Sequence, residues 1–201
     1  MLLLGHAGIT LSSAIIVDAV LNRKQFQKES LPLTHPVKER LDTRLKSLAQ
    51  HIDIRILLIG SLLPDIIDKP LGYLIFSETL ANGRIFCHTF LFLFLVIAVG
   101  LYFHRKVKNN WLLVLSFGIF THLVFDQMWL APHTLFWPLY GWSFPPGDSN
   151  IALFIMGMLM ELLSSPSTYI SEIIGAIVLL IFTWRLIRLK SLNSFIRKGC
   201  I

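Results

Sequence analysis

The sequence has few charged residues for its length. Only 15% of its 201 residues are Asp, Glu, Lys or Arg, whereas 54% are hydrophobic. Soluble domains carry about 25% charged residues, so this chain lacks the polar side chains needed to cover a globule of its size. The composition therefore excludes an ordinary soluble domain and indicates an integral membrane protein.

Cysteine is scarce as well, with Cys87 in an apolar run and Cys200 next to last. Two cysteines so placed do not make a disulfide framework. The net charge is +6, which in a soluble protein would suggest nucleic acid as a partner. In a membrane protein, basic residues instead gather in cytoplasmic loops, and we expect no nucleic-acid partner.

Long apolar runs predict five membrane-spanning helices, because one span needs about 20 mostly apolar residues. We expect Pro64 and Pro70 to break the second of these helices. The fold class is therefore all-α, as one integral-membrane domain over residues 1–201. The five runs are Leu2–Leu21, Ile54–Phe76, Ile85–Phe103, Trp111–Leu130 and Tyr169–Ile187.

Two further helices are expected outside the spans. The apolar run Ile151–Leu163 is too short to cross a membrane and is typical of an interfacial or re-entrant helix. The segment Pro36–Gln50 places Val37, Leu41, Leu45 and Leu48 on one side, which predicts a basic amphipathic helix on the cytoplasmic membrane surface. We expect the segment Pro132–Asn150, rich in Pro, Gly and aromatic residues, to be irregular.

The basic residues predict the orientation of the chain. Of the 18 Lys and Arg residues, all but Lys69 and Arg84 lie in residues 22–55, 105–108 or 185–198. With five spans these segments fall on one side of the membrane, which the positive-inside rule makes the cytoplasm. We therefore expect the N-terminus outside and the C-terminus in the cytoplasm of a prokaryotic-type plasma membrane.

Histidine and aspartate converge on the non-cytoplasmic ends of the predicted helices. Ionisable residues within a span are costly and usually face a partner or a water-filled cavity. Grouped His and Asp without basic partners suit zinc or another divalent transition metal. His122 and Asp126 are four residues apart and share a helix face, which makes them the most specific pair. The converging residues are His6, Asp65, Asp68, His88, His122, Asp126 and His133.

Several alternatives remain open for single members of this group. A lone His in an apolar helix is often hydrogen-bonded to a carbonyl rather than bound to metal, which applies first to His6. The stretch around His88 and Thr89 could instead form a helix cap. His133 could face water, and Glu161 or Glu172 could supply a further carboxylate.

Four segments resemble the YdjM-like, LexA-regulated membrane-bound metal-dependent hydrolase family. They are Gly5-His6, Leu62–Asp68, Gly83–Thr89, and Thr121–Asp126 leading to Leu135–Pro138. The resemblance covers residues 1–145 in order and leaves 146–201 as extra C-terminal helices. Two positions depart from the family pattern. Gly83 replaces a His, and Asp65 and Asp68 have one more residue between them.

The resemblance implies a membrane-embedded, metal-dependent hydrolase acting on an ester or phosphoester of a lipid-like substrate. Its ligands to one or two divalent ions, zinc above all, would be His6, Asp65, His88, His122 and Asp126. Arg84 would stabilise negative charge that develops on the substrate. Asp68 would be a further ligand or the general base, and a metal-activated water would be the nucleophile.

Two other classes of function remain as alternatives. A purely structural metal site would have no open position for water. A divalent-cation transporter would need polar residues through the whole membrane depth, whereas Leu91–Gly100 and Leu112–Leu115 are almost purely apolar.

Overall fold

The computed structural model describes residues 2–21, 44–45, 47–49, 52–147 and 151–199. These residues contain helices and no strand. The predicted amphipathic helix over residues 36–50 falls largely outside the described residues. Its members Leu45 and Leu48 are described, and both are buried in an apolar cluster with residues of α1, α4 and α9.

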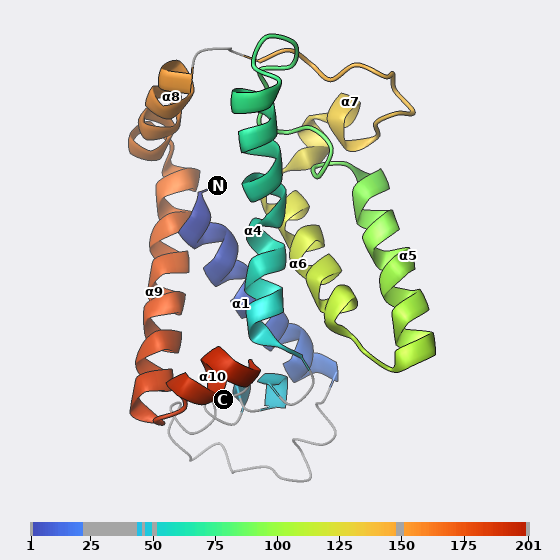
Figure 1. Cartoon of the computed structure of the whole chain (residues 1–201). Helices are drawn as coiled ribbons and strands as arrows, with labels where there is room; N and C mark the ends of the chain where they lie inside the picture. The colour runs from blue at the N-terminus through green and yellow to red at the C-terminus, as the bar shows by residue number, and fades with distance from the viewer. Residues whose placement is uncertain (1, 22–43, 46, 50–51, 148–150, 200–201) are drawn as a thin grey trace.

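The long helices run side by side between two ends of the molecule (Figure 1). Helix α1 packs against α9 and α4, and α6 packs against α4 and α5. The C-terminal helix α10 lies at the end shown at the bottom, and the short helix α7 at the end shown at the top. The long helices are α1 (Leu3–Leu21), α4 (Ile54–Pro70), α5 (Phe90–Val107), α6 (Trp111–Phe125) and α9 (Pro166–Arg188).

Short elements complete the described chain. A π-helical turn, η1 (Leu71–Ile75), continues α4, and a 3-10 turn, η2 (Met128–Leu130), follows α6. The other short helices are α7 (Pro132–Leu135), α8 (Ile151–Ser164) and α10 (Leu192–Lys198). The segment expected to be irregular from Pro132 thus contains one short helix at its beginning.

Three helices are long and apolar enough to cross a membrane, namely α1, α5 and α9. Only 11% of the α5 span is buried within the protein, so most of its apolar side chains are left for lipid to cover. Helix α6 is apolar but shorter. The all-α fold class with apolar helices of spanning length is confirmed, and among the described residues three helices are candidate membrane spans.

The structure corrects three local predictions. Pro64 and Pro70 do not break the second helix, because α4 runs through both and continues into the π-turn η1. The third helix begins at Phe90 rather than at Ile85, with the Thr89 hydroxyl accepting a hydrogen bond from the Phe92 amide at 3.1 Å. The fourth helix ends at Phe125, so Asp126 is its C-cap.

Glycines allow the closest approach between helices. Gly118 of α6 lies against α4, where a Cβ atom would come within 2.6 Å of the Leu57 carbonyl oxygen and 2.7 Å of the Ser61 nitrogen. Gly8 of α1 faces Gly175 of α9 backbone to backbone. Such small residues are typical of helix interfaces in membranes. They bring α6 close to α4 and α1 close to α9.

Candidate metal centre

His122 is fixed by the close contact between α4 and α6. Its ring is fully buried, and its Nδ1 donates to the carbonyl oxygen of Ser61 at 2.7 Å. A histidine that donates through one nitrogen leaves the other as an electron-pair donor. The Ser61 contact therefore turns Nε2 of His122 toward the remaining site residues.

His88 is held in the same way by Asp68. The fully buried Asp68 carboxylate accepts the ring Nδ1–H of His88 at 2.7 Å. The same carboxylate accepts the backbone amides of Ile85 at 2.9 Å, Cys87 at 3.0 Å and His88 at 3.2 Å. Asp68 thus shapes the turn before α5 and presents Nε2 of His88 to the site.

Asp65 faces both of these histidines. Its Oδ1 lies 3.6 Å from Nε2 of His88 and 3.9 Å from Nε2 of His122. Its Oδ2 accepts a hydrogen bond from Lys69 Nζ at 2.7 Å. One carboxylate oxygen is therefore held by a cation while the other points at two imidazole nitrogens.

The three donor atoms fit a divalent ion. The two Nε2 atoms of His88 and His122 lie 3.2 Å apart, which completes a triangle of 3.2, 3.6 and 3.9 Å with Asp65 Oδ1. In tetrahedral zinc sites, ligand distances of about 2.0–2.1 Å place ligand atoms about 3.3 Å apart. Asp65, His88 and His122 could therefore hold a metal ion after small movements of their side chains.

A second group shares His122. His6 Nε2 lies 3.1 Å from Asp126 Oδ1, and its ring stacks on the ring of His122 with 4.1 Å between centroids. His6 is buried, and its Nδ1 has no hydrogen-bond partner among the described residues. His6, His122 and Asp126 form a second set of donors close enough to hold an ion.

The end of α1 that carries His6 is anchored by α9. The Glu172 carboxylate accepts the amides of Leu2 at 2.7 Å, Leu4 at 3.1 Å and Gly5 at 3.0 Å. A carboxylate at a helix N-terminus satisfies free amides and the helix dipole. Glu172 is therefore engaged in capping, and neither donor group contains it.

Arg84 lies at the outer edge of the second group. Its Nη2 is 2.8 Å from Asp126 Oδ2, and its side chain is 48% exposed. A residue larger than Gly83 would require Tyr73 to shift, because a Cβ atom there would lie 2.8 Å from Cε2 of Tyr73 and 3.2 Å from Cγ of Lys69. Tyr73 and the Lys69 stem occupy the space that a side chain at this position would need.

The structure thus brings together all five residues expected to bind metal. Asp68 lies outside both donor groups and contacts His88 instead. His133 is exposed and packs near Tyr140, away from the others. Burial and then the Asp68 carboxylate raise the pKa of the Cys87 thiol, which keeps it from acting as a thiolate ligand.

The groups that position the candidate ligands were not predicted from the sequence. The Ser61 acceptor is a backbone carbonyl, which no residue type reveals. The ion pair of Lys69 with Asp65 could have been predicted, because Lys69 follows Asp65 by four residues on one helix. Thr10 and Thr121, whose hydroxyls hydrogen-bond at 2.9 Å between α1 and α6, gave no distinctive pattern.

A cavity of about 550 Å³ lies beside the second donor group. Asp126 and Arg84 form part of its wall, together with Glu161 of α8 and Thr168 of α9. Trp129 and Leu130 of η2 also line this cavity. The donor cluster is therefore bordered by a space that a small molecule can enter.

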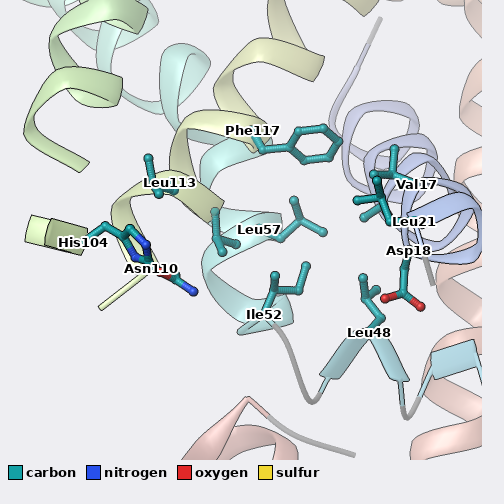
Figure 2. A pocket seen from close by; sticks show the side chains of 12 residues that line it. Val17, Asp18, Leu21, Leu48, Ile52, Leu57, His104, Asn110, Leu113 and Phe117 are labelled. Carbon is teal, nitrogen blue, oxygen red and sulfur yellow. The ribbon is translucent and has the colours of Figure 1, made fainter. Parts of the chain in front are cut away.

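A different cavity, of about 470 Å³, contains none of the predicted ligands. Figure 2 shows it between Asp18, with Val17 and Leu21, on one side and His104 and Asn110 on the other. Its remaining wall is apolar and includes Leu57 and Phe117. This pocket is separate from the candidate metal centre.

Comparison with known proteins connects this geometry to a family. The chain matches no curated protein and no solved structure. The sequence profile of the YdjM inner membrane protein family matches residues 1–192. The matched region contains both donor groups and extends through α9, beyond the four motifs that carry the resemblance. The chain belongs to the YdjM inner membrane protein family.

Proposed function

We propose that this protein is a membrane-embedded, metal-dependent hydrolase of a lipid-like phosphoester. The observation that carries the proposal is the triangle of Asp65, His88 and His122 donor atoms, with sides of 3.2, 3.6 and 3.9 Å. Catalytic zinc sites have three protein ligands and an open position, whereas structural sites are closed by four. The family membership supports the membrane location but names no reaction.

The donor chemistry favours zinc. Two imidazole nitrogens and a carboxylate oxygen are a common zinc ligand set. Since Nδ1 of His122 is engaged by Ser61, His122 has one nitrogen to offer and can serve one ion. We assign that ion to Asp65, His88 and His122. His6 and Asp126 are the pair that a second ion would use.

The bound ion would supply Lewis acidity and a water molecule activated for attack. In hydrolysis the water oxygen forms a bond to phosphorus, one ester P–O bond breaks, and a water proton ends on the leaving alcohol. Arg84, half exposed at the cavity wall, would bind the phosphoryl oxygens through its guanidinium group. The hydrogen bonds of Asp68 favour a positioning role for it rather than that of general base.

The two alternative functions receive less support. A closed structural site would not need the cavity that borders Asp126 and Arg84. A transport path would need polar groups along the helices, whereas the apolar residues Leu93, Ile119 and Leu123 pack between α5 and α6. The hydrolase proposal accounts for both the donor triangle and the adjacent cavity.

We further propose that α4 and α6 cross the membrane with α1, α5 and α9, which makes five spans. The donor cluster then lies near the non-cytoplasmic face. The basic residues at the ends of α5 and α9 and along α10 support this orientation. Lys69 and Arg84 would be the basic residues on the outer side, and both contact site carboxylates.

Metal content of the purified protein tests the central claim. We expect the wild type to retain a stoichiometric divalent ion and His122→Ala, Asp126→Ala to lose it. The single variant His133→Ala is the matched control, because that histidine is exposed and outside both donor groups. Equal metal content in the wild type and the double variant would disprove the metal site.

Hydrolysis is tested separately with the same preparations. We expect the zinc-loaded wild type and His133→Ala to cleave a generic phosphodiester and a short-chain phospholipid, and the double variant to be inactive. A metal-loaded wild type that cleaves neither substrate would favour the structural metal site.

A further inference from the structure

The cavity beside Asp126 carries an unusual pair of opposite charges. Asp126 belongs to the donor cluster, which leaves Arg84 and Glu161 as the other charged residues of the described wall. Arg84 comes from the loop before α5, whereas Glu161 comes from α8, far away in the sequence. A ligand in this cavity therefore meets one cation and one carboxylate beyond the metal ligands.

The carboxylate of Glu161 is oriented by its neighbour. Thr168, a buried residue near the start of α9, donates its hydroxyl to Glu161 Oε1 at 3.3 Å. The hydroxyl of Ser167 adds a further polar group to the same wall. Arg84, the basic residue of the described wall, pairs with Asp126 at 2.8 Å. Glu161 forms no ion pair among the described residues, so its charge suits a cationic group on the ligand.

Another part of the wall is apolar and accessible. Trp129 is 56% exposed and Leu130 is 72% exposed, and both line the cavity. Tryptophan is enriched where membrane proteins meet the lipid–water interface. These residues would contact the apolar part of a ligand that enters from the bilayer.

We propose that the cavity recognises the zwitterionic headgroup of an aminophospholipid. Arg84 binds the phosphate oxygens, Glu161 binds the ammonium group, and the acyl chains leave past Trp129 and Leu130. This inference rests on the proposed hydrolase function for its choice of a phosphoester. It adds a specificity residue, Glu161, which acts on the headgroup and not on the bond that breaks.

Equilibrium binding tests the proposal without requiring turnover. The probes are dihexanoyl phosphatidylethanolamine and dihexanoyl phosphatidylglycerol, which share a phosphodiester and differ in the ammonium group. Binding to the full-length protein in detergent, freed of metal so that neither lipid is cleaved, would be measured by titration calorimetry. A charge-assisted hydrogen bond to Glu161 should make the wild type prefer the ethanolamine lipid by about tenfold.

Matched variants identify the group responsible. Glu161→Gln should bring the ratio of the two dissociation constants close to one, whereas Glu161→Asp should restore part of the preference. Glu78→Gln is the control, because Glu78 is also exposed but does not line the cavity. It should keep the wild-type ratio.

Two outcomes would overturn the proposal: equal affinity of the wild type for the two lipids, or an unchanged preference in Glu161→Gln. Both are read from binding alone. A preference that depends on Glu161, found in a protein that hydrolyses neither lipid, would support headgroup recognition and refute only the hydrolase function.

Discussion

Four of the five candidate ligand side chains in the donor cluster are held by a partner on the side away from the other ligands. Asp65 and Asp126 present Oδ1 to histidines and Oδ2 to Lys69 and Arg84, respectively. His88 donates to a carboxylate and His122 to a carbonyl oxygen. Such outer contacts fix the orientation of metal ligands and tune their basicity.

Asp68 offers the clearest test of this support. Asp68→Asn removes the carboxylate that accepts Nδ1–H of His88, while the five proposed ligands stay unchanged. We expect zinc affinity to fall about 10- to 100-fold without being abolished. Competition with a chromogenic chelator measures the change. Unchanged affinity, or complete loss with a normally folded protein, would contradict the positioning role.

The candidate metal ligands could be predicted from the sequence better than the residues that position them. His6, His88, His122, Asp65 and Asp126 stood out because ionisable residues are rare in apolar segments. The role of Asp68 depends on the fold of residues 85–88, whose amides it accepts. Ile85 and Phe86 belong to an apolar run that predicts a helix. The turn over residues 85–88 could therefore not be predicted from the sequence.

Among the elements, α4 and α6 determine the site because they approach most closely. The Ser61 carbonyl reaches His122 only because Gly118 lets the two backbones come together. Length and hydropathy predicted that both helices exist. Their contact could not be predicted, since a glycine in an apolar helix does not reveal which helix it faces.

Replacing Gly118 should therefore disturb both stability and metal binding. In Gly118→Ala the new methyl group meets the backbone of Leu57 and Ser61, and overpacking of this kind costs about 1–3 kcal/mol. We expect a lower Tm in detergent and weaker zinc binding.

Gly157→Ala is the control for this variant, because nothing lies within 4 Å of a Cβ atom there. It should leave Tm and zinc affinity unchanged or slightly improved, since alanine favours helix. A Gly118→Ala protein as stable as Gly157→Ala, with intact zinc binding, would show that the close contact does not matter.

At the opposite end of α4, Asp53 provides a pH-dependent cap. Partial burial opposes ionisation of its carboxyl, but the side-chain and backbone hydrogen bonds from Arg55 outweigh burial, so the pKa of Asp53 lies below its ordinary value. Arg55 also donates to the Ile196 carbonyl at 2.6 Å. The charged cap therefore links the start of α4 to α10.

The ionised form of Asp53 should stabilise the fold only above its unfolded pKa. Because the folded pKa is the lower one, this contribution is complete at neutral pH and declines as the pH falls below about 4. Asp53→Asn, which can still cap the helix, should lower Tm at pH 7. The difference from wild type should shrink toward pH 3. A difference that grows with acidity would contradict this account.

For the whole molecule, the donor cluster lies toward one end, and most of the described basic residues lie toward the other. Helix α7 and the end of α6 that is capped by Asp126 lie at the top of Figure 1, while α10 and the link between α5 and α6 lie at the bottom. Composition and charge pattern predicted this polarity. They could not predict the cavity beside Asp126, because Glu161 and Arg84 come to line it together only once α8 has packed on α9.

Accessibility of single cysteines tests the orientation of the molecule. In a Cys200→Ala background, Cys87 is buried and should not react. Leu139→Cys, at an 84% exposed position beyond α7, should react with an impermeant maleimide on intact spheroplasts. Lys106→Cys, exposed at the end of α5, should react only after permeabilisation. The reverse pattern would place the donor cluster on the cytoplasmic side, where the positive-inside rule would fail for this chain.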